Sequence, residues 1–420
     1  MLLLLLVSSY ASVHGLTQCF LKRLINNTIN ITSIQSMDIK TAEYYFTRQK
    51  FSYNQASNKG PFWQLIILLV GSVALSVANA EPVLNIFNWA DYIGDTTIED
   101  FEEEFGINVN YDIYESSELV DAKMMAGKSG YDLVVHSAAF SSRLLSAGIY
   151  GKLDWSKLDN RENLDPKLVD HFSRFDPGNQ YGVPYMWGTT GFSYNRDLLL
   201  ERMPDAPLDS AEMVFNPDIL ARFADCGVSL LDSSNDVIPL VMIYLGHPPN
   251  SIRPQHLKEA ENTLKAIRPF IRYFSSTKML LDLPAKEICI AQSWSGDYSI
   301  ASRRAREAGI DLNLGYNIPK EGSLIWFDAW YIPADAPNLN NAYLFLDYLL
   351  RPDVIAAISN YVGYANSNIM AKPLVDPAMT SDPAIYPDDS VVARLAPGRV
   401  YPPKQERART RVWTRLKYGL

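Results

Sequence analysis

Residues 83–135 read VLNIFNWADYIGDTTIEDFEEEFGINVNYDIYESSELVDAKMMAGKSGYDLVV, a stretch in which short apolar runs alternate with amphipathic ones. The apolar runs predict three strands, at Val83–Trp89, Val109–Tyr114 and Tyr131–Val135. The amphipathic stretches predict two helices, one capped by Asp95 or Thr96 and ended by Gly106, and one around residues 118–126. Strands that alternate with helices indicate an α/β fold with a mostly parallel, doubly wound sheet.

Polar and aromatic residues stand where two of these strands end. Trp89, Asp91 and Tyr92 lie at or just after the end of the first strand, and Ser137 follows the third. Ligands of such sheets bind beyond the carboxyl ends of the strands. The sequence therefore predicts that these four residues lie at a ligand-binding edge.

The composition of the 420-residue chain, 47% apolar and 20% charged, allows two globular domains. The first 80 residues hold six of the 38 basic side chains and two of the 47 acidic ones, so the remainder carries 32 against 45, a net charge of about −13. An acidic surface repels nucleic acid and attracts small cations. A cationic ligand is therefore favoured, and a nucleic-acid partner is not expected.

An export signal is predicted inside the chain, at residues 59–80. There Lys59 precedes the apolar run Leu65–Val77 and the small-residue ending ANA at 78–80, which predicts cleavage before Glu81. The alternative is a retained membrane anchor, because residues 61–80 have about the ~20-residue length that spans a bilayer.

The domain boundaries are inferred from extended segments, because no repeat or glycine-serine linker interrupts residues 81–420. Three segments are candidates for chain that crosses between two lobes, namely Val183–Asn195, Ile318–Ala334 and Tyr361–Asn368. The resulting prediction is an N-lobe of residues 81–185 and 326–362 and a C-lobe of residues 186–325 and 363–420. Residues 1–80 are interpreted as a non-mature extension plus signal peptide, with Met37 as one candidate for a later start.

The chain contains three cysteines, of which Cys19 lies in the segment predicted to be removed. Cys226 and Cys289 then form an even pair in a compartment that permits oxidation. We expect a disulfide between them, and two buried free thiols are the alternative.

Motifs for metal, cofactor and nucleophilic chemistry are absent from the sequence. His136, His171, His247 and His256 show no spacing that sets two on one helical face as metal ligands. There is no GxSxG elbow, no GxxxxGK[ST] loop and no GxGxxG turn. The segment SWSGD at 293–297 is a poor serine elbow, because an indole replaces the glycine that the turn needs. We therefore expect no metal, no cofactor and no enzymatic activity.

Aromatic residues are closely paired with carboxylates at three places: Trp89 with Asp91 and Tyr92, Trp294 with Asp297, and Trp326 with Asp328. A protonated primary amine needs both groups. The carboxylate binds its ammonium, and aromatic faces bind its methylenes and attract the cation by ~0.5–2 kcal/mol. Any single pair is more often a core tryptophan beside a helix-capping aspartate, but three pairs at strand ends favour capture of an amine.

Six segments carry a resemblance to a known family: NWADYI (88–93), GYDLVV (130–135), PYMWGTTG (184–191), WSGD (294–297), FD (327–328) and YAN (364–366). With them, residues 81–420 resemble the bacterial periplasmic polyamine-binding proteins, most closely the putrescine-binding ones. The resemblance implies a two-lobed periplasmic solute-binding protein fold of the Venus-flytrap type, each lobe a mostly parallel sheet flanked by helices. It also implies a monomer in the periplasm of a Gram-negative bacterium, which captures putrescine or spermidine between its lobes and delivers it to the membrane permease of an ABC importer.

The resemblance also assigns roles to individual residues. Asp297 and Asp328 match the carboxylates that bind ammonium groups, and Cys226 with Cys289 matches the disulfide pair of the family. The aromatic walls and further pocket positions fall on Trp89, Tyr92, Trp294, Trp326 and Tyr364, and on Asp91, Ser137 and Asp236.

Three positions depart from the family pattern. Ala90 stands where relatives usually carry a hydroxyl, Asp236 where they carry glutamate, and His136 where proline commonly precedes the pocket serine. Ala90 lacks the hydroxyl of the relatives, and the Asp236 side chain is one methylene shorter than glutamate. These differences predict weaker binding or a different amine.

Two other functions fit the same residue types. An exported glycoside hydrolase also uses aromatic platforms and paired carboxylates, although it needs one carboxyl group held protonated. An amine-sensing module that reports to a membrane receptor shares the fold and differs only in its partner.

Overall fold

The computed structural model describes residues 82–115, 117–399, 401 and 403–419. Glu81–Leu420 form one compact unit. The predicted signal segment 59–80, its cleavage before Glu81, and Cys19 lie outside the described residues. No helix in the described part of the chain is both long and apolar enough to cross a membrane.

A single sheet of eleven strands organises the described chain. The strands are β1 (Val83–Trp89), β2 (Asn108–Tyr114), β3 (Leu133–Ser137), β4 (Gly182–Asn195), β5 (Val228–Leu230), β6 (Tyr273–Phe274), β7 (Ile290–Trp294), β8 (Leu314–Asn317), β9 (Ser323–Tyr331), β10 (Ala365–Asn366) and β11 (Leu395–Pro397). Their main order is β2-β1-β3-β9-β4-β7-β5-β6, while β8 and β10 pair with β4 and β11 pairs with β9. The ends of the sheet are parallel, β1 with β2 and β3, and β5 with β6 and β7. The predicted α/β class is confirmed.

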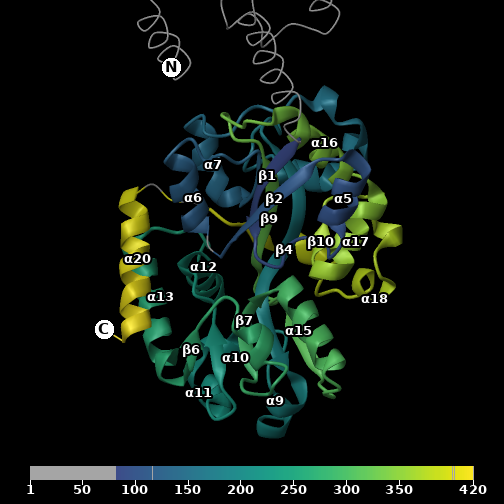
Figure 1. Ribbon diagram of the computed structural model, residues 1–420. Helices are drawn as coiled ribbons and strands as arrows, with labels where there is room; N and C mark the ends of the chain where they lie inside the picture. Colours follow the sequence, from purple (N-terminus) through teal and green to yellow (C-terminus); the bar gives the residue numbers. More distant parts are fainter. Residues whose placement is uncertain (1–81, 116, 400, 402, 420) are drawn as a thin grey trace, which may run out of the picture. The chain divides into compact units, whose positions relative to one another are not determined.

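Helices flank this sheet throughout. They are α5 (Thr97–Phe105), α6 (Ser117–Met125), α7 (Ala138–Ser146), α8 (Pro166–Phe172), α9 (Arg196–Arg202), α10 (Glu212–Phe215), α11 (Pro217–Leu220), α12 (Ser234–Tyr244), α13 (Pro254–Ile267), α14 (Met279–Asp282), α15 (Ser295–Glu307), α16 (Leu339–Leu349), α17 (Pro352–Val362), α18 (Pro377–Thr380), α19 (Asp389–Val392) and α20 (Pro403–Tyr418). Figure 1 shows α20 lying along α13, with which it is in contact.

Two large apolar cores lie on this sheet. The first is built on β1, β2 and β3 and includes Leu84, Phe101 and Val135. The second is built on β5 and β7 and includes Val228, Val241 and Ile290. We call the parts of the chain around these cores the first and the second lobe.

Local sequence signals place the first elements where they were expected. The helix α5 ends at Gly106, whose φ of 63° is the left-handed conformation that glycine adopts readily. The third strand differs, since β3 begins at Leu133 and not at Tyr131. The buried carboxylate of Asp132 accepts hydrogen bonds from the backbone N–H groups of Asn85 (2.8 Å) and Asn338 (2.6 Å), and so anchors the loop before the strand.

The strands β4 and β9 belong to both lobes. Near Gly182, β4 pairs with the part of β9 next to β3, and from Thr190 to Asn195 it pairs with β7 and β8. Figure 1 shows the two strands running together from the region of β1 towards β7. These strands correspond to two of the three predicted crossing segments, and the third contains β10, which pairs with Met186 and Trp187 of β4. The exact lobe boundaries stay a prediction.

The predicted disulfide between Cys226 and Cys289 is present, with the two Cα atoms 5.5 Å apart. Cys226 precedes β5 and Cys289 precedes β7. The bond therefore lies at the amino ends of these two parallel strands, opposite to the end at which Trp294 leaves β7.

Candidate functional site

The centre of the candidate site is Asp328, in the middle of β9. It is paired with Ser137 of β3 on one side. On its other side the register of β4 shifts between Pro184 and Trp187. Such a bulge bends a strand and redirects its side chains, and it also accommodates the proline that a regular central strand excludes.

The carboxyl group of Asp328 is buried, at 8% exposure for the residue. Burial raises the pKa of Asp328 to about 7, and a polar contact with the hydroxyl of Tyr92 offsets this in part. No lysine or arginine among the described residues forms an ion pair with this carboxyl group.

Tyr92 is held in place through its backbone. Its carbonyl oxygen accepts hydrogen bonds from the hydroxyl of Tyr185 (2.9 Å) and from Nδ2 of Asn88 (3.2 Å). Its ring lies edge-on to the rings of Tyr185 and Tyr364, each at 5.5 Å between centroids. Its own buried hydroxyl makes the polar contact with Asp328 and has no other partner in the described part of the chain.

A second buried carboxyl group, that of Asp297, lies in the first turn of α15 directly after β7. Its Oδ1 accepts a 2.8 Å hydrogen bond from the hydroxyl of Tyr364, whereas its Oδ2 is buried without a partner among the described residues. Burial raises the pKa of Asp297 to about 7, against the opposing effects of the Tyr364 hydrogen bond, of the backbone of Trp294 and of the charge of Arg304.

Two glycines allow aromatic rings to pack closely around these carboxyl groups. A Cβ atom on Gly296 would overlap the ring of Tyr364, and one on Gly188 would overlap the indole of Trp326. Tyr364 and Trp326 therefore stand against the backbone of α15 and β4, with their rings 5.4 Å apart. Trp326 and Asp328 are two residues apart on β9 and so share one face of the strand.

The two other predicted tryptophans are half-buried. Trp89 lies 4.5 Å from the ring of Tyr114, and its Nε1 is buried without a partner among the described residues, as is that of Trp326. Trp294 packs against both apolar cores, and its Nε1 donates a 3.2 Å hydrogen bond to Oδ1 of Asp236.

Asp236, in the first turn of α12, accepts hydrogen bonds at both carboxylate oxygens. Thr190 Oγ1 donates to Oδ1 (2.9 Å) and Ser233 Oγ donates to Oδ2 (2.6 Å), in addition to the bond from Trp294. Burial raises the pKa of Asp236, and these three hydrogen bonds oppose the rise.

The other predicted positions lie at the periphery. Asp91 is exposed and has a φ of 55°, and Ser137 is half-buried where β3 ends. The side chain of His136 lies in the interior, where Nδ1 is 3.1 Å from the hydroxyl of Tyr150. Burial lowers the pKa of His136 to about 3, so this histidine is neutral at physiological pH.

Several residues of the site escaped the sequence reasoning. The hydroxyl of Tyr185 donates a hydrogen bond to the backbone of Tyr92, and the ring of Tyr114 lies at a tilt against Trp89. Tyr316 donates a 2.8 Å hydrogen bond to the carbonyl of Thr189 and lies near both Asp236 and Asp297. Tryptophans and aspartates that are neighbours in sequence do not indicate which hydroxyl groups other strands contribute. The only signal available was the aromatic content of the segment 184–191.

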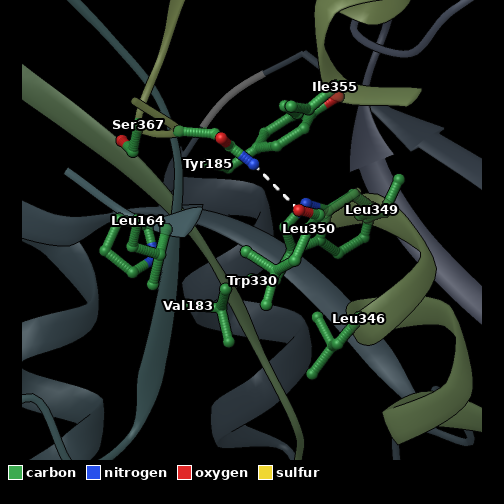
Figure 2. A pocket seen from close by; sticks show the side chains of 11 residues that line it. Leu164, Val183, Tyr185, Trp330, Leu346, Leu349, Leu350, Ile355 and Ser367 are labelled. Carbon is green, nitrogen blue, oxygen red and sulfur yellow. Dashed lines mark hydrogen bonds between the residues drawn. The ribbon is translucent and has the colours of Figure 1, made fainter. Parts of the chain in front are cut away.

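A small cavity of about 10 Å³ lies beside Tyr185 in the first lobe (Figure 2). Tyr185, Trp330 and Leu350 are among the residues that line it, and the bond drawn there runs from Nδ2 of Asn368 to the carbonyl of Leu350 (2.8 Å). Its volume suffices for about one water molecule and not for an organic ligand. The described residues also contain no group of three or more side chains suited to hold a metal ion.

The candidate site thus combines buried carboxyl groups with aromatic rings of the first core and with Trp294, which packs against both cores. The family model for bacterial extracellular solute-binding proteins matches residues 96–387. The chain belongs to this family. The match covers strands and helices of both lobes, and it agrees with the predicted two-lobed fold.

Two relatives with assigned names and one solved structure are similar to this chain over most of its length. A putrescine-binding periplasmic protein of Pseudomonas aeruginosa is 44% identical over 357 residues, 84% of this chain and 97% of that protein. A putrescine-binding periplasmic protein of Escherichia coli is also 44% identical over 357 residues, 84% of this chain and 95% of that protein. The structure of the spermidine/putrescine ABC transporter substrate-binding protein of Streptococcus pneumoniae superposes with a TM-score of 0.68 at 29% identity, covering 80% of this chain and 99% of that one. The predicted resemblance is confirmed.

Proposed function

We propose that this protein captures a small polyamine, putrescine first and spermidine second, in the periplasm and delivers it to the permease of an ABC importer. The observation that carries the proposal is the pair of buried carboxyl groups, Asp297 and Asp328, among aromatic rings. Neither forms an ion pair with a lysine or arginine of the described chain, and Oδ2 of Asp297 has no donor there.

A dication is the natural counterpart of this arrangement. A carboxylate without a cationic partner costs several kcal/mol when it is buried, which is why both pKa values are raised to about 7. An alkyl diammonium supplies one charge to each carboxylate. Its methylene chain then packs against the rings of Tyr92, Trp326 and Tyr364. Tyr364 lies edge-on to both other rings, its hydroxyl is bonded to Asp297, and the hydroxyl of Tyr92 contacts Asp328.

The proposed roles follow from these positions. Asp297 and Asp328 bind the two ammonium groups, the aromatic rings of Trp89, Tyr92, Trp294, Trp326 and Tyr364 enclose the chain, and Ser137 lies beside Asp328. Asp91 is exposed, so any contact with the ligand would come from the edge of the site.

The relatives at 44% identity support putrescine as the ligand, since both are named as putrescine-binding periplasmic proteins. They also support a transport role without catalysis. A glycosidase separates the pKa values of its two carboxyl groups so that one stays protonated. In this protein, burial raises the pKa of Asp297 and that of Asp328 to the same value, about 7.

The test is a calorimetric titration of the purified protein at pH 8 with putrescine and spermidine, and with butylamine and 1,4-butanediol as controls. Putrescine should bind in the micromolar range or tighter. Butylamine carries one charge and butanediol none, so the first should bind far more weakly and the second not at all. Absence of binding by both polyamines below millimolar concentration would overturn the proposal.

A further inference from the structure

We propose that Asp236 is a positioning residue that fixes the orientation of Trp294, and that it does not bind an ammonium group of the ligand. This inference rests on the proposed polyamine function, because it concerns a wall of the same site. It assigns to Asp236 a role other than the one that its position in the sequence suggests.

The hydrogen bonds of Asp236 converge from three separate segments. The indole of Trp294 comes from the end of β7, the hydroxyl of Thr190 from β4, and the hydroxyl of Ser233 from the residue before α12. Thr190 and Trp294 are direct partners in the β4–β7 ladder. Asp236 therefore connects the first turn of α12, through hydrogen bonds, to one pair of neighbouring residues in the sheet.

This attachment controls a residue that both lobes share. Trp294 packs against both apolar cores, and the next turn of the chain carries Asp297. Five aromatic side chains of the proposed site carry an N–H or O–H group. The indoles of Trp89 and Trp326 have no partner for that group in the described chain. The hydroxyls of Tyr92 and Tyr364 contact the carboxyl groups of Asp328 and Asp297. Trp294 is the one whose indole N–H is bonded to a carboxylate.

The oxygens of Asp236 are also less available than those of the other carboxyl groups. Oδ1 accepts two hydrogen bonds and Oδ2 one, whereas Oδ2 of Asp297 accepts none among the described residues. An ammonium group that approached Asp236 would have to compete with donors already in place, while Asp297 offers an oxygen that no protein group occupies.

The variant Asp236→Asn separates the two roles. Asparagine keeps an oxygen for the bonds from Trp294 and Thr190, and its amide group can donate to the Ser233 hydroxyl, so the positioning role survives while the negative charge is lost. We expect Asp236→Asn to bind putrescine within about threefold of wild type. Asp236→Ala, which removes both oxygens, should bind about tenfold more weakly. Asp297→Asn is the matched control, because there the same change should weaken binding by about 30-fold or more.

A second readout reports the orientation of Trp294 directly. In ¹⁵N-labelled protein, the indole N–H signal that disappears in Trp294→Phe belongs to Trp294, and its exchange with solvent can be followed without ligand. The Trp294 indole N–H should stay protected from exchange with solvent in Asp236→Asn and lose that protection in Asp236→Ala. In the Trp294→Phe background, Asp236→Ala should change the putrescine Kd by less than about twofold, because the indole that Asp236 orients is already gone.

Each result decides between the roles. Loss of more than about 30-fold in affinity in Asp236→Asn, or additive losses in the double variant, would show that Asp236 binds the ligand. Unchanged indole exchange in Asp236→Ala would show that Asp236 does not position Trp294. If the wild-type protein binds neither polyamine, the proposed function fails, while the exchange measurement still tests the positioning role by itself.

Discussion

The hydroxyl of Tyr364 donates a 2.8 Å hydrogen bond to one carboxylate oxygen of Asp297, and the other oxygen has no hydrogen-bond partner among the described residues. The bond orients the carboxyl group, and the neighbouring Gly296 provides the room for the Tyr364 ring. Protein contacts thus hold the Asp297 carboxyl group in place, although burial raises the pKa values of both Asp297 and Asp328.

Replacement of Asp328 by Asn should strongly weaken the binding of putrescine. The variant keeps the shape of the side chain but removes the charge, so one desolvated ammonium group loses its counter-ion. We expect a loss on the order of 2–5 kcal/mol, or about 30-fold to several-thousand-fold in Kd by calorimetry. Asp297→Asn should act alike. Asp205→Asn is the matched control, at an exposed aspartate that has no assigned place in the site, and should change Kd by about twofold or less. Binding as tight as wild type in Asp328→Asn would contradict the assignment.

The affinity for putrescine should fall as the pH is lowered from 8 to 6. A carboxyl group with a pKa of about 7 is roughly 90% protonated at pH 6, and it must lose that proton to pair with an ammonium group, which stays charged up to about pH 9. Each of the two groups then reduces affinity up to about tenfold at pH 6. Titrations at pH 7 in buffers of different ionisation enthalpy should detect release of about one proton per ligand. Equal Kd values at pH 6 and 8 with no proton release would rule this linkage out.

The same two carboxyl groups should make the ligand-free protein less stable as the pH rises, whereas they make its affinity for putrescine higher. Their pKa values are raised in the folded state, so the folded protein binds more protons than the unfolded chain between about pH 4 and 7. Their contribution to stability is therefore present at low pH and is lost as the pH rises through this range. Asp328→Asn should raise the Tm of the ligand-free protein at pH 8 by about 2 °C or more, on the order of 1 kcal/mol. At pH 5, where the wild-type carboxyl is already protonated, the gain should shrink, and an equal gain at both pH values would refute the explanation.

Much of the fold was predictable because its signals are local. The periodicity of residues 83–135 predicted the order of strands and helices, and the two cysteines that remain after residues 1–80 predicted the Cys226–Cys289 bond. The predicted start of β3 was wrong by two residues. At Asp132 the chain is not in a strand, because the Asp132 carboxylate accepts hydrogen bonds from the backbone N–H groups of Asn85 and Asn338. Neither partner can be inferred from the neighbouring sequence.

The candidate site was predictable in its residue types but not in its hydrogen bonds. The pairing of tryptophans with aspartates pointed to Asp297 and Asp328, both of which the structure buries. The three donors of Asp236, in contrast, come from β4, β7 and the loop before α12, and the bulge beside Asp328 depends on the register of β4 against β9. Such contacts between distant segments leave no pattern in the sequence.

Loss of the disulfide should destabilise the protein and leave the site intact. The bond joins residues 63 positions apart, for which the chain-entropy model gives a contribution of about 4 kcal/mol. Cys226 and Cys289 precede β5 and β7, whereas Trp294 and Asp297 follow the opposite end of β7. The double variant Cys226→Ser, Cys289→Ser should therefore unfold at lower denaturant concentration and still bind putrescine within about threefold of wild type. A large loss of affinity in folded double variant would contradict this separation.

Gly296→Ala should weaken binding through Tyr364 alone. Gly296 lies in the first turn of α15 with no left-handed backbone, so alanine suits the helix itself and is favoured there by roughly 1 kcal/mol. Its Cβ, however, would overlap the Tyr364 ring, which must move and so release Asp297 from its hydrogen bond. We expect about a tenfold rise in the putrescine Kd by calorimetry. Tyr364→Phe, which removes the hydroxyl and keeps the ring, serves as the comparison: a smaller loss there would show that the position of the ring matters more than the hydrogen bond. Wild-type affinity in a folded Gly296→Ala protein would mean that the close packing of Tyr364 on α15 is not needed for binding.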